Sequence, residues 1–300
     1  MSKRTLAILA AIGATTIYAL NHTIAKSVMP DHVQPFAFII FRVAGAALLF
    51  WIVSIFGPKE KIEKRDYLRL LVCAVLGMGI NMLVFFKGLS LSTPINSSVL
   101  VTTTPIIVLI LSAILIKERI SQRKIFGIAI GLIGALGLIL FGSEIRQDAP
   151  NIPLGNFFIL MNSVFYGSYL ITVKPLLAKY HPFTFMKWLF TLGIILCLPF
   201  GYREFTEIDF ANLPIDAVWS ILFVVVGTTF CTYLFNIFAL TQLKASTLSA
   251  FVYIQPLIGI LYATAVGKDN LTILKILAAC LVLLGVYLAS RKASPNLSGS

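Results

Sequence analysis

Ten apolar stretches, each about as long as a lipid bilayer is thick, follow one another along the chain. A membrane-spanning helix needs about 20 mostly apolar residues. The stretches cover residues 5–27, 34–56, 68–89, 95–116, 122–141, 153–173, 183–201, 215–239, 246–266 and 271–290. The connections between them are too short to fold as separate domains, so the sequence predicts an all-α membrane protein with ten transmembrane helices.

The composition excludes most other classes of protein. Hydrophobic residues make up 58% of the chain and charged residues 12%, with a mean hydropathy of +0.93, whereas soluble domains carry about a quarter charged residues. A soluble enzyme, a disordered protein and a disulfide-stapled secreted domain are therefore excluded. The cysteines lie inside apolar runs without CxxC spacing, so we expect no metal and no cofactor: Cys73, Cys197, Cys231 and Cys280.

The positive charges indicate an orientation rather than a nucleic-acid partner. The net charge is +12, but Lys and Arg gather in short bursts between the apolar runs. With the N-terminus in the cytoplasm, 17 of them fall inside and six outside, which is the bias of cytoplasmic loops. We therefore expect both termini to be cytoplasmic, in a bacterial-type inner membrane. The short loops leave no room for an ATPase module, so no ATPase subunit is predicted; the partners are membrane lipid and a small-molecule substrate.

The second half of the chain repeats the first. Residues 95–139 align with the later sequence at an offset of 151, and aligned pairs include Pro105 with Pro256, Lys124 with Lys275 and Gly134 with Gly285. The two repeats are residues 1–147 and 148–300, with five helices each. Because five is odd, the second repeat enters the membrane from the opposite side. Inverted repeats of this kind are the architecture of many alternating-access secondary transporters.

The segment KGLSLSTPINSSVLVTTTPIIVLILSAILIKERIS, residues 87–121, resembles the signature of the drug/metabolite transporter superfamily, EamA-type branch. Phe41-Arg42 in the second helix also resembles the family pattern. The resemblance spans the whole chain as two units, and it is looser in the second, where Lys268-Asp269 stands in place of Gly-Glu. It implies a ten-helix carrier of small metabolites, often an exporter, and it implies no particular substrate.

Two cations near the outer side are candidate substrate ligands. Arg42 lies roughly 12 Å deep, counting from the helix start near Gln34. It could hold a carboxylate or phosphate in a cavity, or it could tie helices together. Lys87 ends the third helix, where it could join Arg42 or snorkel to the headgroups. Asn81 lies deeper on the same helix.

Other polar side chains form stripes that should face the bundle interior, because polar groups are costly in lipid. Helical spacing places Tyr18, Asn21 and His22 on one face. Further candidate substrate-binding residues are Thr103, Asn162, Tyr166, Tyr169, Thr232, Tyr233 and Tyr253. Asn236 shares the face of Thr232 and Tyr233, and Gln255 directly precedes Pro256. These stripes predict a central polar cavity, or alternatively hydrogen bonds between helices.

Two further motifs concern helix shape and packing. Pro105 and Pro256 fall within apolar runs at equivalent places, where proline kinks a helix, so they are either paired hinges or static kinks. Gly127, Gly131 and Gly134 have a spacing that permits close helix contact, either between the repeats or in a homodimer.

The sequence favours a secondary transporter over other functions. An intramembrane enzyme would need a nucleophile or metal motif, and none is present, so we predict no catalytic residues. No Asp or Glu lies in the centre of an apolar stretch, and His22 alone titrates near neutral pH at depth, so we predict uncoupled transport or exchange. Arg42 and Lys87 favour amino-acid-like or other carboxylated metabolites as substrates. Outward movement of these compounds is what the family resemblance implies. The alternatives are a proton-coupled exporter of amphipathic or drug-like compounds, a channel, or a non-transporting sensor.

Overall fold

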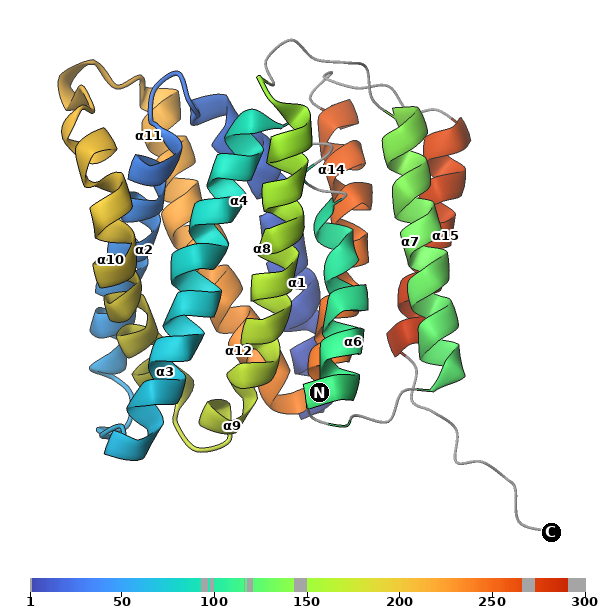
Figure 1. The fold of residues 1–300 in the computed structure, drawn as a ribbon, viewed down its shortest axis with the longest axis horizontal. Helices are drawn as coiled ribbons and strands as arrows, with labels where there is room; N and C mark the ends of the chain where they lie inside the picture. The colour runs from blue at the N-terminus through green and yellow to red at the C-terminus, as the bar shows by residue number, and fades with distance from the viewer. Residues whose placement is uncertain are drawn as a thin grey trace.

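The computed structural model describes residues 2–92, 97, 100–115, 117, 121–142, 150–265 and 273–290. All regular secondary structure in these ranges is helical, and the long helices stand side by side as one bundle (Figure 1). Each of the ten predicted stretches contains helix.

The elements of the first half are α1 (Lys3–Val28), α2 (Pro35–Ser54), η1 (Lys64–Asp66), α3 (Tyr67–Ala74), η2 (Val75–Gly79), α4 (Ile80–Leu91), η3 (Val101–Thr103), α6 (Thr104–Leu115) and α7 (Gln122–Gly142). Those of the second half are α8 (Ile152–Thr172), α9 (Lys174–Leu177), α10 (Pro182–Thr206), η4 (Phe210–Asn212), α11 (Ile215–Leu222), η5 (Phe223–Cys231), α12 (Thr232–Gln242), α13 (Ala245–Ala250), η6 (Phe251–Tyr253), α14 (Ile254–Ala265) and α15 (Ile273–Ser290).

Six continuous helical segments among the described residues are long and apolar enough to cross a bilayer. They are Lys3–Val28, Pro35–Ser54, Lys64–Leu91, Ile152–Leu177, Pro182–Thr206 and Ile215–Gln242. Val101–Leu115 and Ala245–Gly259 are shorter apolar helices within the same part of the chain. The all-helical prediction is therefore confirmed, and six helical segments of the described residues have the length and hydropathy of a membrane span.

Local sequence explains where several helices begin. Proline occupies the first turn of α2, α8 and α10, where its missing N–H would have no helical partner. The Asn151 side chain accepts a hydrogen bond from the Leu154 amide at the start of α8. His181 Nδ1 accepts one from the Phe183 amide at the start of α10. These caps satisfy amides that a helix leaves unpaired.

Irregular helical turns recur in the same order in both halves. The π-helix η2 separates α3 from α4, and the π-helix η5 separates α11 from α12. A one-turn 3₁₀ helix, η3 or η6, precedes the proline-containing α6 or α14. The sequence predicted both prolines in mid-helix. In the structure Pro105 and Pro256 lie in the first turn of an α-helix that continues from a 3₁₀ turn. Proline is tolerated there because the 3₁₀ turn already breaks the α-helical hydrogen bonding.

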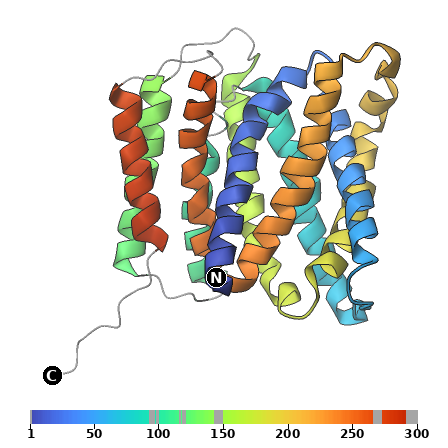
Figure 2. The same cartoon turned by 180° about the vertical axis from the view of Figure 1, so that it is seen from behind.

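The two halves interlock helix by helix. The most extensive packing joins α1 to α12, α4 to α8, α2 to α10, and α7 to α15, so each pair combines one helix from either half. In Figures 1 and 2, α7 and α15 stand at one end of the molecule and α2 and α10 at the other. A Cβ atom on Gly285 would lie 2.5 Å from Gly131 Cα. The predicted close glycine contact is thus present within the chain.

Candidate functional site

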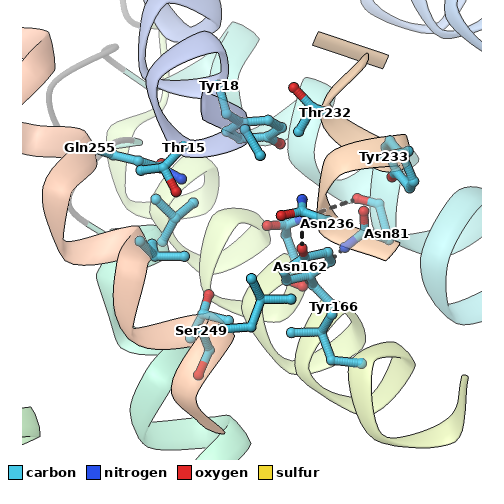
Figure 3. A pocket seen from close by; sticks show the side chains of 16 residues that line it. Thr15, Tyr18, Asn81, Asn162, Tyr166, Thr232, Tyr233, Asn236, Ser249 and Gln255 are labelled. Atoms are coloured by element: carbon cyan, nitrogen blue, oxygen red, sulfur yellow. Dashed lines mark hydrogen bonds between the residues drawn. The ribbon is translucent and has the colours of Figure 1, made fainter. Parts of the chain in front are cut away.

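A polar cavity of about 60 Å³ lies in the middle of the bundle, and both halves of the chain contribute to it. Figure 3 shows its labelled side chains converging from several helices. Most of its polar groups come from α1, α4, α8 and α12. The lining residues are Ala14, Thr15, Tyr18, Asn81, Val101, Thr104, Asn162, Tyr166, Leu170, Thr232, Tyr233, Asn236, Leu248, Ser249, Val252 and Gln255.

Two asparagines hold α4 and α8 together at the cavity wall. Asn81 Nδ2 donates to the Asn162 carbonyl at 3.2 Å, and Asn162 Nδ2 donates to the Asn81 carbonyl at 3.1 Å (Figure 3). Both side chains are buried. Each amide therefore binds the backbone of the other helix, which fixes the two side chains against the cavity.

The tyrosines of the cavity are tied to neighbouring helices. The Tyr233 hydroxyl donates to the carbonyl of Gly77 in η2 at 3.2 Å, and Asn236 Nδ2 donates to the Tyr166 hydroxyl at 3.4 Å. Thr232 Oγ1 donates to the carbonyl of Gly227 in η5 at 3.1 Å. The π-helical turns thus offer carbonyl oxygens to side chains of the site, consistent with the frequent occurrence of such turns at functional sites.

Arg42 lies beside the cavity and is 2% exposed. Its Nε donates to Thr229 Oγ1 at 2.8 Å, and its guanidinium carbon lies 4.8 Å from the centre of the Phe86 ring. The Thr229 hydroxyl donates its own proton to the Val224 carbonyl in η5 at 2.7 Å, so its oxygen is free to accept from Arg42. The cavity residues Tyr18 and Tyr233 lie close enough to interact electrostatically with the guanidinium.

No carboxylate of the described residues lies within ion-pair distance of Arg42. A cation removed from water without a counter-charge carries a large desolvation cost. Its surroundings are hydroxyl groups and aromatic rings, which stabilise the charge only in part. The site can therefore attract an anionic group from a ligand.

His22 connects α1 to two other helical segments next to the cavity. Its Nδ1 lies 3.1 Å from Ser97 Oγ, and its Nε2 lies 3.4 Å from Gln255 Oε1. The ring also makes edge contacts with Tyr18 and Phe85, at 5.6 Å between ring centres in each case. Because an amide oxygen only accepts, the Nε2–H tautomer suits this arrangement, with Ser97 donating to Nδ1.

The structure brings six of the predicted substrate-binding residues together in the cavity lining: Tyr18, Asn81, Asn162, Tyr166, Thr232 and Tyr233. Arg42 and His22 lie directly behind this lining. Asn21 is fully buried, and its side chain has no partner within the described residues.

Four of the predicted residues lie elsewhere. Lys87 is exposed, with its ammonium 5.9 Å from the centre of the Phe36 ring. Thr103 Oγ1 donates to the Leu100 carbonyl at 2.7 Å. The remaining two are tyrosines buried between helices: Tyr169 packs against Gly77, and Tyr253 donates to the Ile128 carbonyl.

Sequence reasoning missed Ser97, Thr104 and Ser249 as parts of the site. Single small hydroxyl residues occur throughout membrane helices, so only their position in the assembled bundle distinguishes these three. Lys268-Asp269 of the second repeat and the side chain of Lys275 lie outside the described part of the chain.

The EamA-like transporter family model matches residues 5–140 and again residues 153–291. The chain belongs to the EamA-like transporter family. An "Uncharacterized transporter" of Archaeoglobus fulgidus is 28% identical, over 86% of this chain and 90% of its own. "Uncharacterized transporter YoaV" of Bacillus subtilis is 26% identical, over 92% and 94% of the two chains.

Two further comparisons bear on fold and function. A "Probable terminal-alkyne amino-acid exporter" of Streptantibioticus cattleyicolor is 22% identical, over 76% of this chain and 74% of its own. A solved crystal structure superimposes with a TM-score of 0.74 at 14% identity, covering 94% and 96% of the two chains. This EamA-family chain is thus a transporter, with the fold of that solved protein, and an integral, multi-pass membrane protein.

Proposed function

We propose that this EamA-family transporter is a secondary carrier that exports small carboxylated, amino-acid-like metabolites across a bacterial inner membrane. The observation that carries the proposal is the buried Arg42 guanidinium, which has no carboxylate partner within the described residues and lies beside a polar cavity. A substrate carboxylate would supply the missing charge through a charge-assisted hydrogen bond.

The rest of the cavity suits the neutral and amino parts of such a substrate. Its polar groups are amides and hydroxyls, among them Asn236, Ser249 and Gln255. Carbonyl and hydroxyl oxygens accept hydrogen bonds from an ammonium group, but they would not neutralise a purely cationic compound. The relationship to a protein named as an amino-acid exporter agrees with this substrate class.

The proposed topology has ten spans in two inverted five-helix units, with both termini cytoplasmic. Support comes from the pairing of first-half with second-half helices and from the matching order of π and 3₁₀ turns. In this scheme the units rock about the central cavity. The 3₁₀ turns before Pro105 and Pro256 bend to accommodate this movement. Replacing both prolines by alanine should therefore slow turnover. Unchanged turnover would show that the prolines are not hinges.

Transport in this proposal is uncoupled or proceeds by exchange. No Asp or Glu lines the cavity as described, and both ring nitrogens of His22 face hydrogen-bonding partners. Counterflow should therefore persist when a protonophore dissipates the pH gradient. Uptake that collapses with the protonophore in both wild type and His22→Ala would contradict this part of the proposal.

The deciding experiment is counterflow in proteoliposomes, with a panel of labelled amino acids. We expect accumulation of at least one of them, lost in Arg42→Gln and partly retained in Arg42→Lys. Arg203→Gln is the matched control, because Arg203 is an exposed arginine that pairs with Glu207 four residues later. Silence for every carboxylated compound, with counterflow of an amphipathic one, would favour a drug-like substrate and a structural Arg42.

A further inference from the structure

Lys26, at the end of α1, reaches across to the end of α4. Its Nζ lies 3.2 Å from each of the carbonyl oxygens of Leu89, Ser90 and Ser92. These carbonyls close α4, where a helix has no further amides to pair with them and where its dipole is negative. A lysine ammonium at this place satisfies several carbonyls at once.

Lys174 makes the corresponding contact in the second half. It is the first residue of α9, two residues after the end of α8, and its Nζ donates to the Leu243 carbonyl at the end of α12 at 3.0 Å. Lys26 lies eight residues after Tyr18, and Lys174 lies eight residues after Tyr166. The same device therefore appears in both repeats, at opposite ends of the bundle, as the positions of α4 and α9 in Figure 1 show.

The two lysines connect two helix pairs at the ends of their helices. α1 packs mainly on α12, and α4 packs mainly on α8, while direct packing of α1 on α4 is sparse. The cavity lies between these pairs, since its polar lining comes largely from these four helices. Lys26 links the pairs at one end of the cavity, and Lys174 links them at the other.

Side chains at the cavity also connect the two helix pairs. Toward Lys26, the Phe85 ring of α4 meets Tyr18 and His22 of α1, with ring centres 5.9 Å and 5.6 Å apart. Toward Lys174, Asn236 of α12 donates to Tyr166 of α8. The two helix pairs therefore meet both through side chains at the cavity and through a lysine at either end.

We propose that Lys26 and Lys174 are the outer and inner latches of the carrier, each holding the helix pairs α1/α12 and α4/α8 together at one face. The inference rests on the proposed alternating-access function, with Lys26 on the outer side. The structure has both lysine contacts formed. Releasing Lys26 from its carbonyls opens the cavity outward, and releasing Lys174 opens it to the cytoplasm.

The test measures access to the cavity from each face separately. In a variant whose four native cysteines are replaced by alanine, Ser249→Cys places one thiol in the cavity wall. A membrane-impermeant maleimide is applied to right-side-out and to inside-out vesicles, and the labelling rate is measured. Lys26→Met, Lys174→Met and the control Lys59→Met, at an exposed loop lysine, are compared in this background.

Lys26→Met should raise the labelling rate from the outside about tenfold, because a tenfold change corresponds to the free energy of about one charge-assisted hydrogen bond. The labelling rate from the inside should stay unchanged. Lys174→Met should do the reverse, Lys59→Met should change neither rate, and Lys26→Arg should stay near the parent rate. Equal increases from both faces, or no increase from either, would overturn the proposal and leave the lysines as helix caps.

Failure of the latches and failure of the proposed substrate class give different results. Labelling rates need no substrate, whereas counterflow depends on it. One-sided changes in labelling with no counterflow of any carboxylated compound would support the latches and contradict the substrate. Normal counterflow with unchanged labelling rates would contradict the latches and support the proposed substrate class.

Discussion

Asn81 and Asn162 hold each other's backbones across the interface of α4 and α8, each side-chain amide donating to the carbonyl of the other residue. The two bonds close a ring between one helix of the first half and one of the second. Because both amides are buried, the bonds do not compete with bulk water. The cavity wall at this place is consequently fixed by two side chains that could also meet substrate.

Replacing Asn81 or Asn162 by alanine should lower the apparent Tm of the detergent-purified protein by about 2 °C or more. Each change leaves a carbonyl without its donor, and hydrogen bonds between membrane helices contribute about 0.6–2 kcal/mol. The double variant should lose less than the sum of the single losses, because either change loosens the same contact. Gln242→Ala, at an exposed amide, is the control; strictly additive losses would show that the two bonds act independently.

Replacing either of two adjacent threonines in η5 by valine should have different effects on the KM for substrate. The Thr229 hydroxyl accepts from Arg42, whereas the buried Thr228 hydroxyl has no partner in the described structure. Thr229→Val should raise the KM for substrate several-fold by letting the guanidinium move, and Thr229→Ser should retain most of the affinity. Thr228→Val should leave KM unchanged and raise the apparent Tm slightly, because it removes an unpaired polar group. Similar KM values for both valine variants would contradict the role of Thr229.

Gly285→Ala should destabilise the pair of α7 and α15. The added Cβ would lie 2.5 Å from Gly131 Cα and 2.7 Å from the Gly127 carbonyl oxygen, and forcing backbones apart costs about 1–3 kcal/mol. Gly259→Ala is the matched control, since nothing lies within 4 Å of its Cβ and alanine favours the helix. Thermal unfolding should separate the two variants clearly; equal stability would mean that the helices shift apart without loss.

An ion-pair cluster joins two loops at the cytoplasmic side of the proposed topology. Lys179 Nζ lies 2.7 Å from a Glu63 carboxylate oxygen and 2.6 Å from one of Asp66. The hydrogen bond from Lys179 lowers the pKa of Glu63 below its ordinary 4.5, although partial desolvation opposes the effect. A carboxyl group with a lowered pKa stabilises the fold above its unfolded value and loses that contribution as pH falls through the folded value.

The apparent Tm should therefore fall as the pH is lowered from about 6 to about 3, and Glu63→Gln should make this fall shallower. Added salt should weaken the difference, because the pair is exposed and easily screened. Glu207→Gln, at an exposed glutamate near the end of α10, is the control. An unchanged acid slope in Glu63→Gln would show that this pair does not contribute to stability.

Hydropathy and helical spacing were sufficient to predict the helices and most of the polar side chains in the cavity wall. Tyr18, Asn81 and Tyr233 were found because polar groups inside an apolar stretch must turn away from lipid. The partner of Arg42 was not predictable, since Thr229 lies 187 residues further along the chain. The relation of Lys26 to Lys174 also escaped, because the repeat alignment at an offset of 151 does not bring these residues into register.

The π-helical turn at Val75–Gly79 makes the orientation of α4 depend on the number of residues in the turn. A π-helical turn holds about one residue more than an α-helical turn, and one residue corresponds to about 100° of helix rotation. Deleting a single residue here would leave α3 and α4 each helical but would rotate one against the other, swinging Asn81 away from Asn162. The number of residues in this turn, more than their identity, therefore sets which face of α4 borders the cavity.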